Sequence, residues 1–228
     1  MFAAVAAVVI TLSTLVAVRA QTPAGPRPMP PGVAGPAARQ SLSFVTHAAF
    51  FSEETHRSPA IDPQVFVKDD AAAEGTGPQN IMHVAGLRSA RVDDAPEAKL
   101  YNAAGDSLGF TLDKWFGASG SVDIDAVAGG GTRLTLTFKR LIAFGVYSLF
   151  RATFSADGQT YVPVDGDGTT NSFTASVDGG AIIVMTSPVR LSHSDAILLV
   201  LHSDSQEHGV SRGLIGINAH EQLIARMP

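Results

Sequence analysis

The 228-residue sequence contains no cysteine. Disulfide bonds, thiolate metal ligands and lipid attachment through a cysteine are therefore excluded. A blue-copper centre is excluded as well, because it needs a Cys ligand. A folded domain of this chain must be held together by side-chain packing, and its 45% of hydrophobic residues are enough to build a core.

Charge is also scarce in this sequence. Only 16% of the residues are charged, and the formal net charge is −5. The lysines and arginines are scattered and form no basic stripe, which argues against nucleic acid as a partner. Long apolar runs are lacking beyond the N-terminal region, so no further membrane span is expected there.

The exception is "MFAAVAAVVITLSTLVAVRA" (residues 1–20), which has the pattern of a secretory signal peptide. Small side chains at Val18 and Ala20 predict cleavage before Gln21. The alternative is an uncleaved N-terminal anchor, since about 17 apolar residues can barely span a bilayer. Cleavage predicts a periplasmic or extracellular protein with no membrane span. Residues 21–40 are rich in Pro, Gly and Ala, and we expect an extended linker.

The remaining residues, 41–228, are predicted to form one all-β domain with an irregular part at 41–95 and core strands at 96–228. The run "SVDIDAV" alternates with period two, as does "TRLTLTFKRL", and "GGG" between them predicts a turn. We expect hairpins here, in "KLYNAAGDSLGFTL", around Asp157-Gly158, and between "SFTASV" and "AIIVMT". "DAILLVLH" is apolar throughout, which predicts a central strand covered on both faces.

Turn signals every 8–12 residues, with short strands between them, are typical of a β-sandwich. The sequence therefore predicts an antiparallel β-sandwich of immunoglobulin-like or superoxide-dismutase-like type. "FTLDKWFGA" fits either one short helical turn or a strand with Trp115 packed on the core.

Three histidines and one aspartate form the candidate metal site. His202 ends the apolar run, Asp204 and His208 follow in the next loop, and His220 precedes the last predicted strand. Adjacent strand ends could bring them to one rim of the sandwich, where imidazoles and a carboxylate would suit zinc or copper. The alternative is that these histidines only hydrogen-bond to loop backbone, because the sequence has no HExxH and no His-x-His strand.

The segment "AILLVLHSDSQEHG" resembles the strand and loop of copper/zinc superoxide dismutase in which an apolar strand ends in a copper-ligating histidine. His202 matches that ligand. The resemblance covers about 14 residues, and this chain lacks the family's paired His-x-His strand and both disulfide cysteines. It implies a related sandwich without dismutase activity.

The same rim, built from residues 203–213 and 216–222, is the expected ligand-binding surface, with Glu207 and Arg212 as candidate contacts. Trp115 is the candidate exposed aromatic, and core packing is its alternative. No G-x-S-x-G elbow is present, so we expect no serine hydrolase. The sequence thus predicts an exported, non-catalytic binding or structural protein with an unknown ligand. The alternative is an exported zinc- or copper-binding protein.

Overall fold

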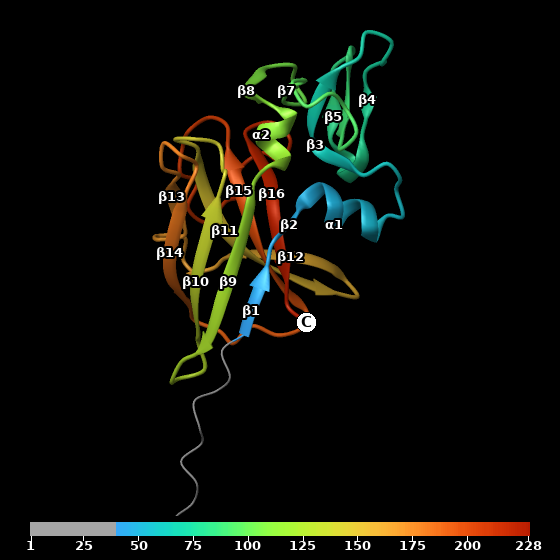
Figure 1. Ribbon diagram of the computed structural model, residues 1–228. Helices are drawn as coiled ribbons and strands as arrows, with labels where there is room; N and C mark the ends of the chain where they lie inside the picture. The colour runs from blue at the N-terminus through green and yellow to red at the C-terminus, as the bar shows by residue number, and fades with distance from the viewer. Residues whose placement is uncertain (1–39) are drawn as a thin grey trace, which may run out of the picture. The chain divides into compact units, whose positions relative to one another are not determined.

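The computed structural model describes residues 40–228 of the chain (Figure 1). The predicted signal peptide at residues 1–20 lies outside this range, as does the predicted linker except for its last residue, Gln40. Within residues 40–228, no helix has the length and apolar character needed to cross a membrane.

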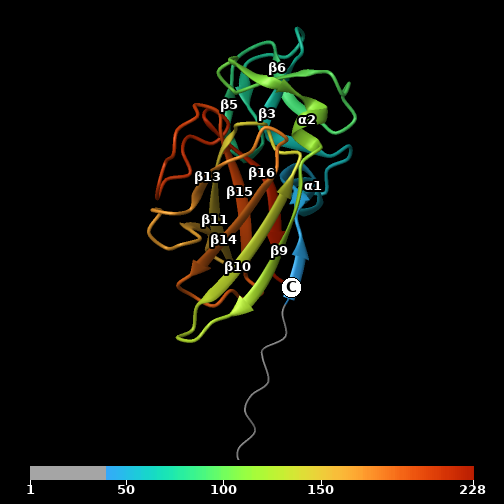
Figure 2. The same cartoon turned by 60° about the vertical axis from the view of Figure 1, so that its left-hand side comes forward.

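Two antiparallel sheets form the body of the molecule (Figures 1 and 2). The first sheet has the strand order β1 (Gln40–Ser43), β9 (Ser119–Ala126), β10 (Thr132–Lys139), β14 (Ala181–Ser187). The second sheet has the order β12 (Gly158–Pro163), β11 (Val146–Ser155), β15 (Asp195–His202), β16 (Ala219–Arg226), β2 (Val45–Thr46), and β13 (Ser172–Thr174) also pairs with β11. The predicted antiparallel sandwich-type fold is therefore confirmed.

The main core lies between these two sheets. Strands β9 and β10 form the predicted hairpin, with Val122 opposite Leu136 and Ile124 opposite Leu134. The alternate residues of β10 point inward and are buried, as period-two patterning requires. They meet buried side chains of the second sheet, among them Tyr147, Leu149, Leu199, Leu201 and Leu223.

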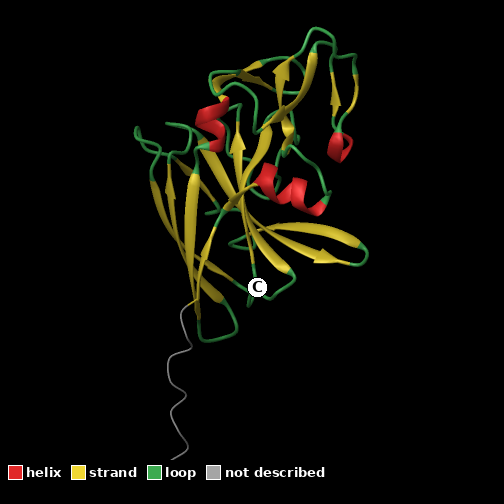
Figure 3. Cartoon of the chain, turned by 45° about the vertical axis from the view of Figure 1, so that its right-hand side comes forward, coloured by secondary structure: helices red, strands yellow, loops and turns green. Residues whose placement is uncertain are grey.

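A smaller sheet stands at one end of the sandwich (Figure 3). Its strand order is β6 (Leu87–Arg91), β3 (Ile61–Lys68), β7 (Lys99–Tyr101), β8 (Ser107–Thr111). The predicted hairpin in "KLYNAAGDSLGFTL" is β7 and β8, but it belongs to this small sheet. The remaining elements are α1 (His47–Glu54), β4 (Gly75–Thr76), the 3₁₀ turn η1 (Pro78–Asn80), β5 (Met82–His83) and α2 (Leu112–Phe116).

Strand β15 is buried along its whole length, as its continuous apolar run predicts. Ile197, Leu199 and Leu201 face the core between the two sheets. Ala196, Leu198 and Val200 face the other way and form a second apolar cluster with Phe50 of α1, Tyr161 of β12 and Ile215. The outer face of the second sheet is therefore apolar too.

The prediction of a hairpin between "SFTASV" and "AIIVMT" is wrong. Strand β13 pairs with β11 in the second sheet, whereas β14 pairs with β10 in the first. The turn at Gly179 carries the chain from one sheet to the other, and Gly179 has φ 73°. A Cβ there would lie 2.3 Å from the Leu141 carbonyl oxygen, so the turn is packed against the β10–β11 connection. Turn chemistry indicates a chain reversal, but it does not say which strand becomes the partner.

Candidate functional site

The structure brings three of the four predicted metal ligands together at the rim of the sandwich. His202, Asp204 and His208 each offer a ligand atom, and these atoms lie within 4.8 Å of one another. The imidazole rings of His202 and His208 stack with their centroids 4.6 Å apart. We call these three residues the rim cluster.

His202 is the buried member of the rim cluster. Its Nε2 is 2.7 Å from Ser148 Oγ on the neighbouring strand β11. Its Nδ1 is buried and has no hydrogen-bond partner among the described residues. The pKa of His202 is lowered to about 4, mainly by burial, and the nearby His208 acts in the same direction. A buried ring nitrogen without a partner is unusual, because buried polar groups are nearly always hydrogen-bonded.

Asp204 and His208 lie in the loop after β15 and are partly exposed. His208 Nε2 is 3.0 Å from Asp204 Oδ2, and Asn218 donates to that same oxygen at 2.8 Å. The Gln206 amide donates to the other Asp204 oxygen at 3.1 Å. These bonds fix the carboxylate beside the two imidazoles. The arrangement offers the nitrogen and oxygen ligands that zinc and copper accept.

The fourth predicted ligand, His220, is not part of the rim cluster. It is fully buried, its Nδ1 is 3.0 Å from the Gln64 carbonyl oxygen, and its Nε2 is 3.2 Å from Ser203 Oγ. The strand register explains this position. His220 lies opposite Leu201, so it shares the inward face of Leu201, whereas His202 faces outward.

The other three predicted site residues lie outside the rim cluster. Glu207 is exposed in the loop beside the rim cluster. Trp115 is only 1% exposed, lies in the main core and donates from Nε1 to Asp62 Oδ2 at 2.8 Å. It is therefore a core residue and does not form an exposed aromatic surface. Arg212 lines a different site.

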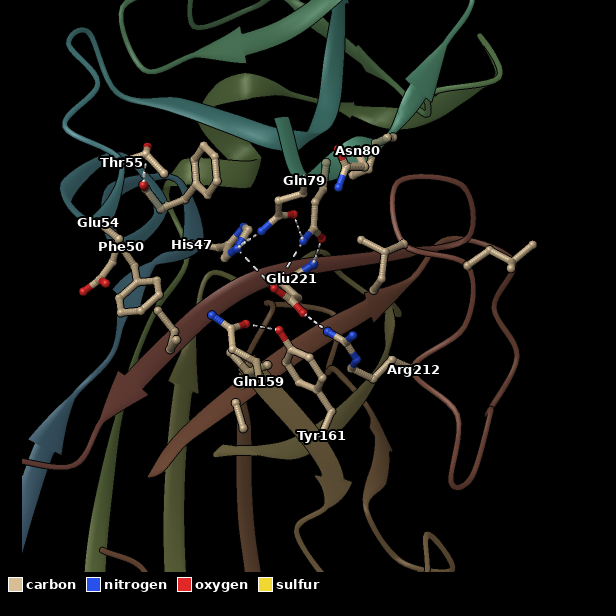
Figure 4. A pocket seen from close by; sticks show the side chains of 18 of the residues that line it. His47, Phe50, Glu54, Thr55, Gln79, Asn80, Gln159, Tyr161, Arg212 and Glu221 are labelled. Atoms are coloured by element: carbon tan, nitrogen blue, oxygen red, sulfur yellow. Dashed lines mark hydrogen bonds and ion pairs between the residues drawn. The ribbon is translucent and has the colours of Figure 1, made fainter. Parts of the chain in front are cut away.

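That different site is a pocket of about 790 Å³ over the outer face of the second sheet (Figure 4). Helix α1, the turn η1, strand β12 and the loop between β15 and β16 surround it. Much of its lining is apolar, from residues Phe50, Phe51, Ile81, Met82, Phe154, Leu198, Leu214, Ile215, Ile217 and Ile224. Pockets of 300–1,000 Å³ with an apolar lining and a few placed polar groups are typical small-molecule sites.

The polar groups of the pocket meet at one carboxylate, that of Glu221 (Figure 4). Its Oε2 is 3.1 Å from His47 Nε2 and accepts from Gln64 Nε2 at 3.2 Å, and its Oε1 accepts from Arg212 Nη1. Gln64 also accepts the Glu221 backbone amide at 2.7 Å and donates to Gln79 Oε1 at 2.8 Å. We call these five residues the Glu221 network.

A β-bulge directs Glu221 into the pocket. Leu199 pairs with Leu223 and Val200 pairs with Glu221, so Gln222 is an extra residue on β16. Leu223 therefore stays in the main core while Glu221 faces outward. Gln222 is held inside by the Tyr147 hydroxyl at 3.1 Å and donates to the Trp115 carbonyl oxygen at 2.8 Å.

Arg212 and Tyr161 form the side wall of the pocket. The guanidinium carbon of Arg212 lies 3.3 Å from the centroid of the Tyr161 ring, which is a close cation–π contact. Burial and the nearby Glu221 charge raise the pKa of Tyr161, so its hydroxyl stays protonated and donates to Gln159 Oε1. Arg212 is thus held by an ion pair on one side and by an aromatic ring on the other.

A second buried acid, Asp62, lies behind the Glu221 network. It accepts from the backbone N–H of Gln64 at 2.9 Å and from Trp115 Nε1 at 2.8 Å. Burial raises its pKa, although the nearby His47 acts in the opposite direction. The core and the pocket are therefore joined through Gln64, which contacts both carboxyl groups.

The lip of the pocket contains two consecutive non-glycine residues in the left-handed region. Gln79 and Asn80 both have φ 58°. Such conformations are unfavourable for residues with a Cβ and recur at ligand-binding segments. Here the turn places the Gln79 amide on the Glu221 network and leaves Asn80 at the pocket edge (Figure 4).

Sequence patterns did not reveal this pocket as a site. Glu221 lies within the predicted rim at residues 216–222, but no sequence pattern marks His47 or Gln64 as site residues. One signal was available, since "AHEQLIAR" places His220, Glu221 and Gln222 inside an otherwise apolar strand. Buried charged residues need partners, so such a strand indicates a polar network.

Comparison with protein-family models, curated proteins and solved structures finds no match for this chain.

Proposed function

We propose that this chain is an exported, non-catalytic binding protein whose small-molecule ligand occupies the pocket above the second sheet. One observation carries the proposal. A pocket of about 790 Å³ combines an apolar lining with a buried and fully hydrogen-bonded carboxylate. Burying such a carboxylate is costly, and the fold satisfies it with three side chains drawn from separate elements.

The proposal predicts that the purified protein retains a bound small molecule. Protein purified without refolding is denatured in organic solvent, and the released compounds are identified by mass spectrometry. We expect one compound near equimolar amount from the wild type and a reduced amount from Leu214→Glu, which alters the pocket mouth. Ile182→Glu, at another exposed position on β14, should release the wild-type amount. Equal release from all three proteins would contradict the proposal.

Export is proposed from the signal-peptide pattern of residues 1–20. N-terminal sequencing of protein recovered from the periplasm or medium should begin at Gln21. Recovery in the membrane fraction with residues 1–20 still attached would support the anchor alternative instead.

A second function is supported by a separate observation. We propose that the rim cluster binds zinc or copper, because the buried Nδ1 of His202 lacks a partner and lies in a group of three potential ligands. A catalytic or exchangeable site needs only three protein ligands. Elemental analysis after purification without chelators or a His tag should find near-stoichiometric metal. His202→Ala and His208→Ala should each remove it, while His193→Ala, at an exposed position, should not. A metal-free, folded wild type would contradict this function.

A further inference from the structure

We infer that the pocket selects a neutral, largely apolar small molecule and rejects anions. This inference rests on the proposed binding function and names the ligand class. Three features of the pocket support it. Its wall is apolar, its charged side chains are already paired within the protein, and neutral polar groups lie at its edge.

The apolar wall comes first. Phe50 of α1, Phe154 of β11 and Ile215 of the β15–β16 loop pack onto the outer apolar cluster and line the pocket. Phe50 and Phe154 contact each other with ring centroids 6.0 Å apart. Met82 and Leu214 at the mouth are 75% and 66% exposed. A ligand that covers these side chains gains affinity by removing apolar surface from water.

The charges of the pocket are already matched within the protein. Both carboxylate oxygens of Glu221 are occupied, by Arg212 on one and by His47 and Gln64 on the other. Arg212 donates from Nη1 to Glu221 and stacks on the face of Tyr161, so its positive charge is balanced by a carboxylate of the protein itself. An anion at this place would meet a cation that Glu221 already neutralises and would be repelled by the carboxylate beside it. A ligand cation would likewise find both Glu221 oxygens engaged.

Neutral polar groups remain at the edge. Gln159 accepts from Tyr161 through Oε1, and its amide nitrogen points away from that ring, on the side of Phe50 (Figure 4). Within residues 40–228, neither this nitrogen nor the side-chain amide of Asn80 has a hydrogen-bond partner. Both groups can donate to a carbonyl or ether oxygen. The strained backbone at Gln79 and Asn80 holds one such donor at the mouth.

Two probes of almost the same shape test this inference on the full mature chain. N-phenyl-1-naphthylamine is neutral, and 1-anilinonaphthalene-8-sulfonate is the same skeleton with a sulfonate. Fluorescence titration should show saturable binding of the neutral probe and at least about tenfold weaker binding of the anionic probe, since the anion meets a paired carboxylate. Leu214→Glu should weaken binding of the neutral probe several-fold, whereas Ile182→Glu should leave its binding unchanged.

A charge variant tests the reason for the selection. Glu221→Gln keeps an oxygen for Arg212 but removes the anion, so the unbalanced cation should strengthen binding of the anionic probe by about tenfold. The neutral probe should change little. A cooperative thermal transition for this variant excludes binding of the dye to a loosened fold.

The outcomes separate the inference from the function on which it rests. Equal or tighter binding of the anionic probe to the wild type would overturn the inference and leave the pocket as a binding site. Failure of both probes, or equal effects of Leu214→Glu and Ile182→Glu, would overturn it as well. The proposed binding function would be contradicted as well only if denaturation of the wild type also released no compound.

Discussion

His47 Nε2 lies 3.1 Å from Glu221 Oε2, and the two side chains are only 4% and 5% exposed. One residue begins helix α1 and the other lies on strand β16, so the pair joins the helix to the outer face of the second sheet. It forms the floor of the pocket and the point where the polar groups converge. Removing one member of such a buried pair strongly destabilises the fold, because the other member is left buried without a partner.

Glu221→Ala should therefore destabilise the protein by about 3 to 5 kcal/mol. Glu54→Ala, which breaks the exposed Glu54–Arg226 pair, should cost about 1 kcal/mol or less. Urea denaturation of both variants and the wild type measures the difference. Equal losses of stability in the two variants would contradict the strong contribution that we assign to the buried contacts of Glu221.

Stability should fall with pH below about 6.5 because of His220. Burial lowers the pKa of folded His220 from 6.5 to about 4, so between these values the unfolded state binds a proton that the folded state does not. The contribution is fully present above pH 6.5, and its loss reaches about 3 kcal/mol near pH 4. His202 acts in the same window, whereas the raised pKa of Asp62 opposes it.

His220→Gln isolates this contribution, since Gln retains a donor and an acceptor but does not titrate. Denaturation curves from pH 7 to pH 4 should show a smaller loss of stability than in the wild type. His193→Gln, at an exposed site, should keep the wild-type slope. Identical slopes for all three proteins would show that His220 titrates normally in the folded state.

Ser148 should tune metal binding at the rim cluster without touching the metal. Its hydroxyl is 2.7 Å from His202 Nε2, which leaves Nδ1 as the free ring nitrogen. Ser148→Ala should weaken zinc binding by about 10- to 100-fold, as loss of a partner that orients a ligating histidine does. Calorimetric zinc titration checks this, with the exposed Ser155→Ala as control. Unchanged affinity would rule out this orienting role.

Trp115→Phe should destabilise the protein although it keeps an aromatic ring. The change leaves Asp62 Oδ2 without its buried donor, at a cost of about 1 to 3 kcal/mol. Phe144→Leu, at an exposed position, should stay within about 0.5 kcal/mol of the wild type. Urea denaturation followed by circular dichroism measures both. A Trp115→Phe protein as stable as the wild type would show that the Asp62 bond contributes nothing.

The sequence determined the β-rich class and its best local pairs. Alternation in β9 and β10 predicted both the hairpin and its inward face, and the apolar run of β15 predicted a strand covered on both sides. These are properties of neighbouring residues, so they can be read without knowing which distant segments meet. The same local rules failed for β13 and β14, because a turn signal does not identify the partner strand.

The site depended on distant contacts. His220 pairs with Leu201 rather than with His202, so His202 faces outward and His220 faces inward. These two predicted metal ligands therefore lie on opposite faces of the second sheet. A bulge at Gln222 turns Glu221 toward a helix that begins at His47, near the start of the described chain. The sequence alone determined that polar residues interrupt apolar strands near the C-terminus. Only the tertiary structure decided which of them meet, because side-chain partners in a sandwich are set by register and layer rather than by spacing along the chain.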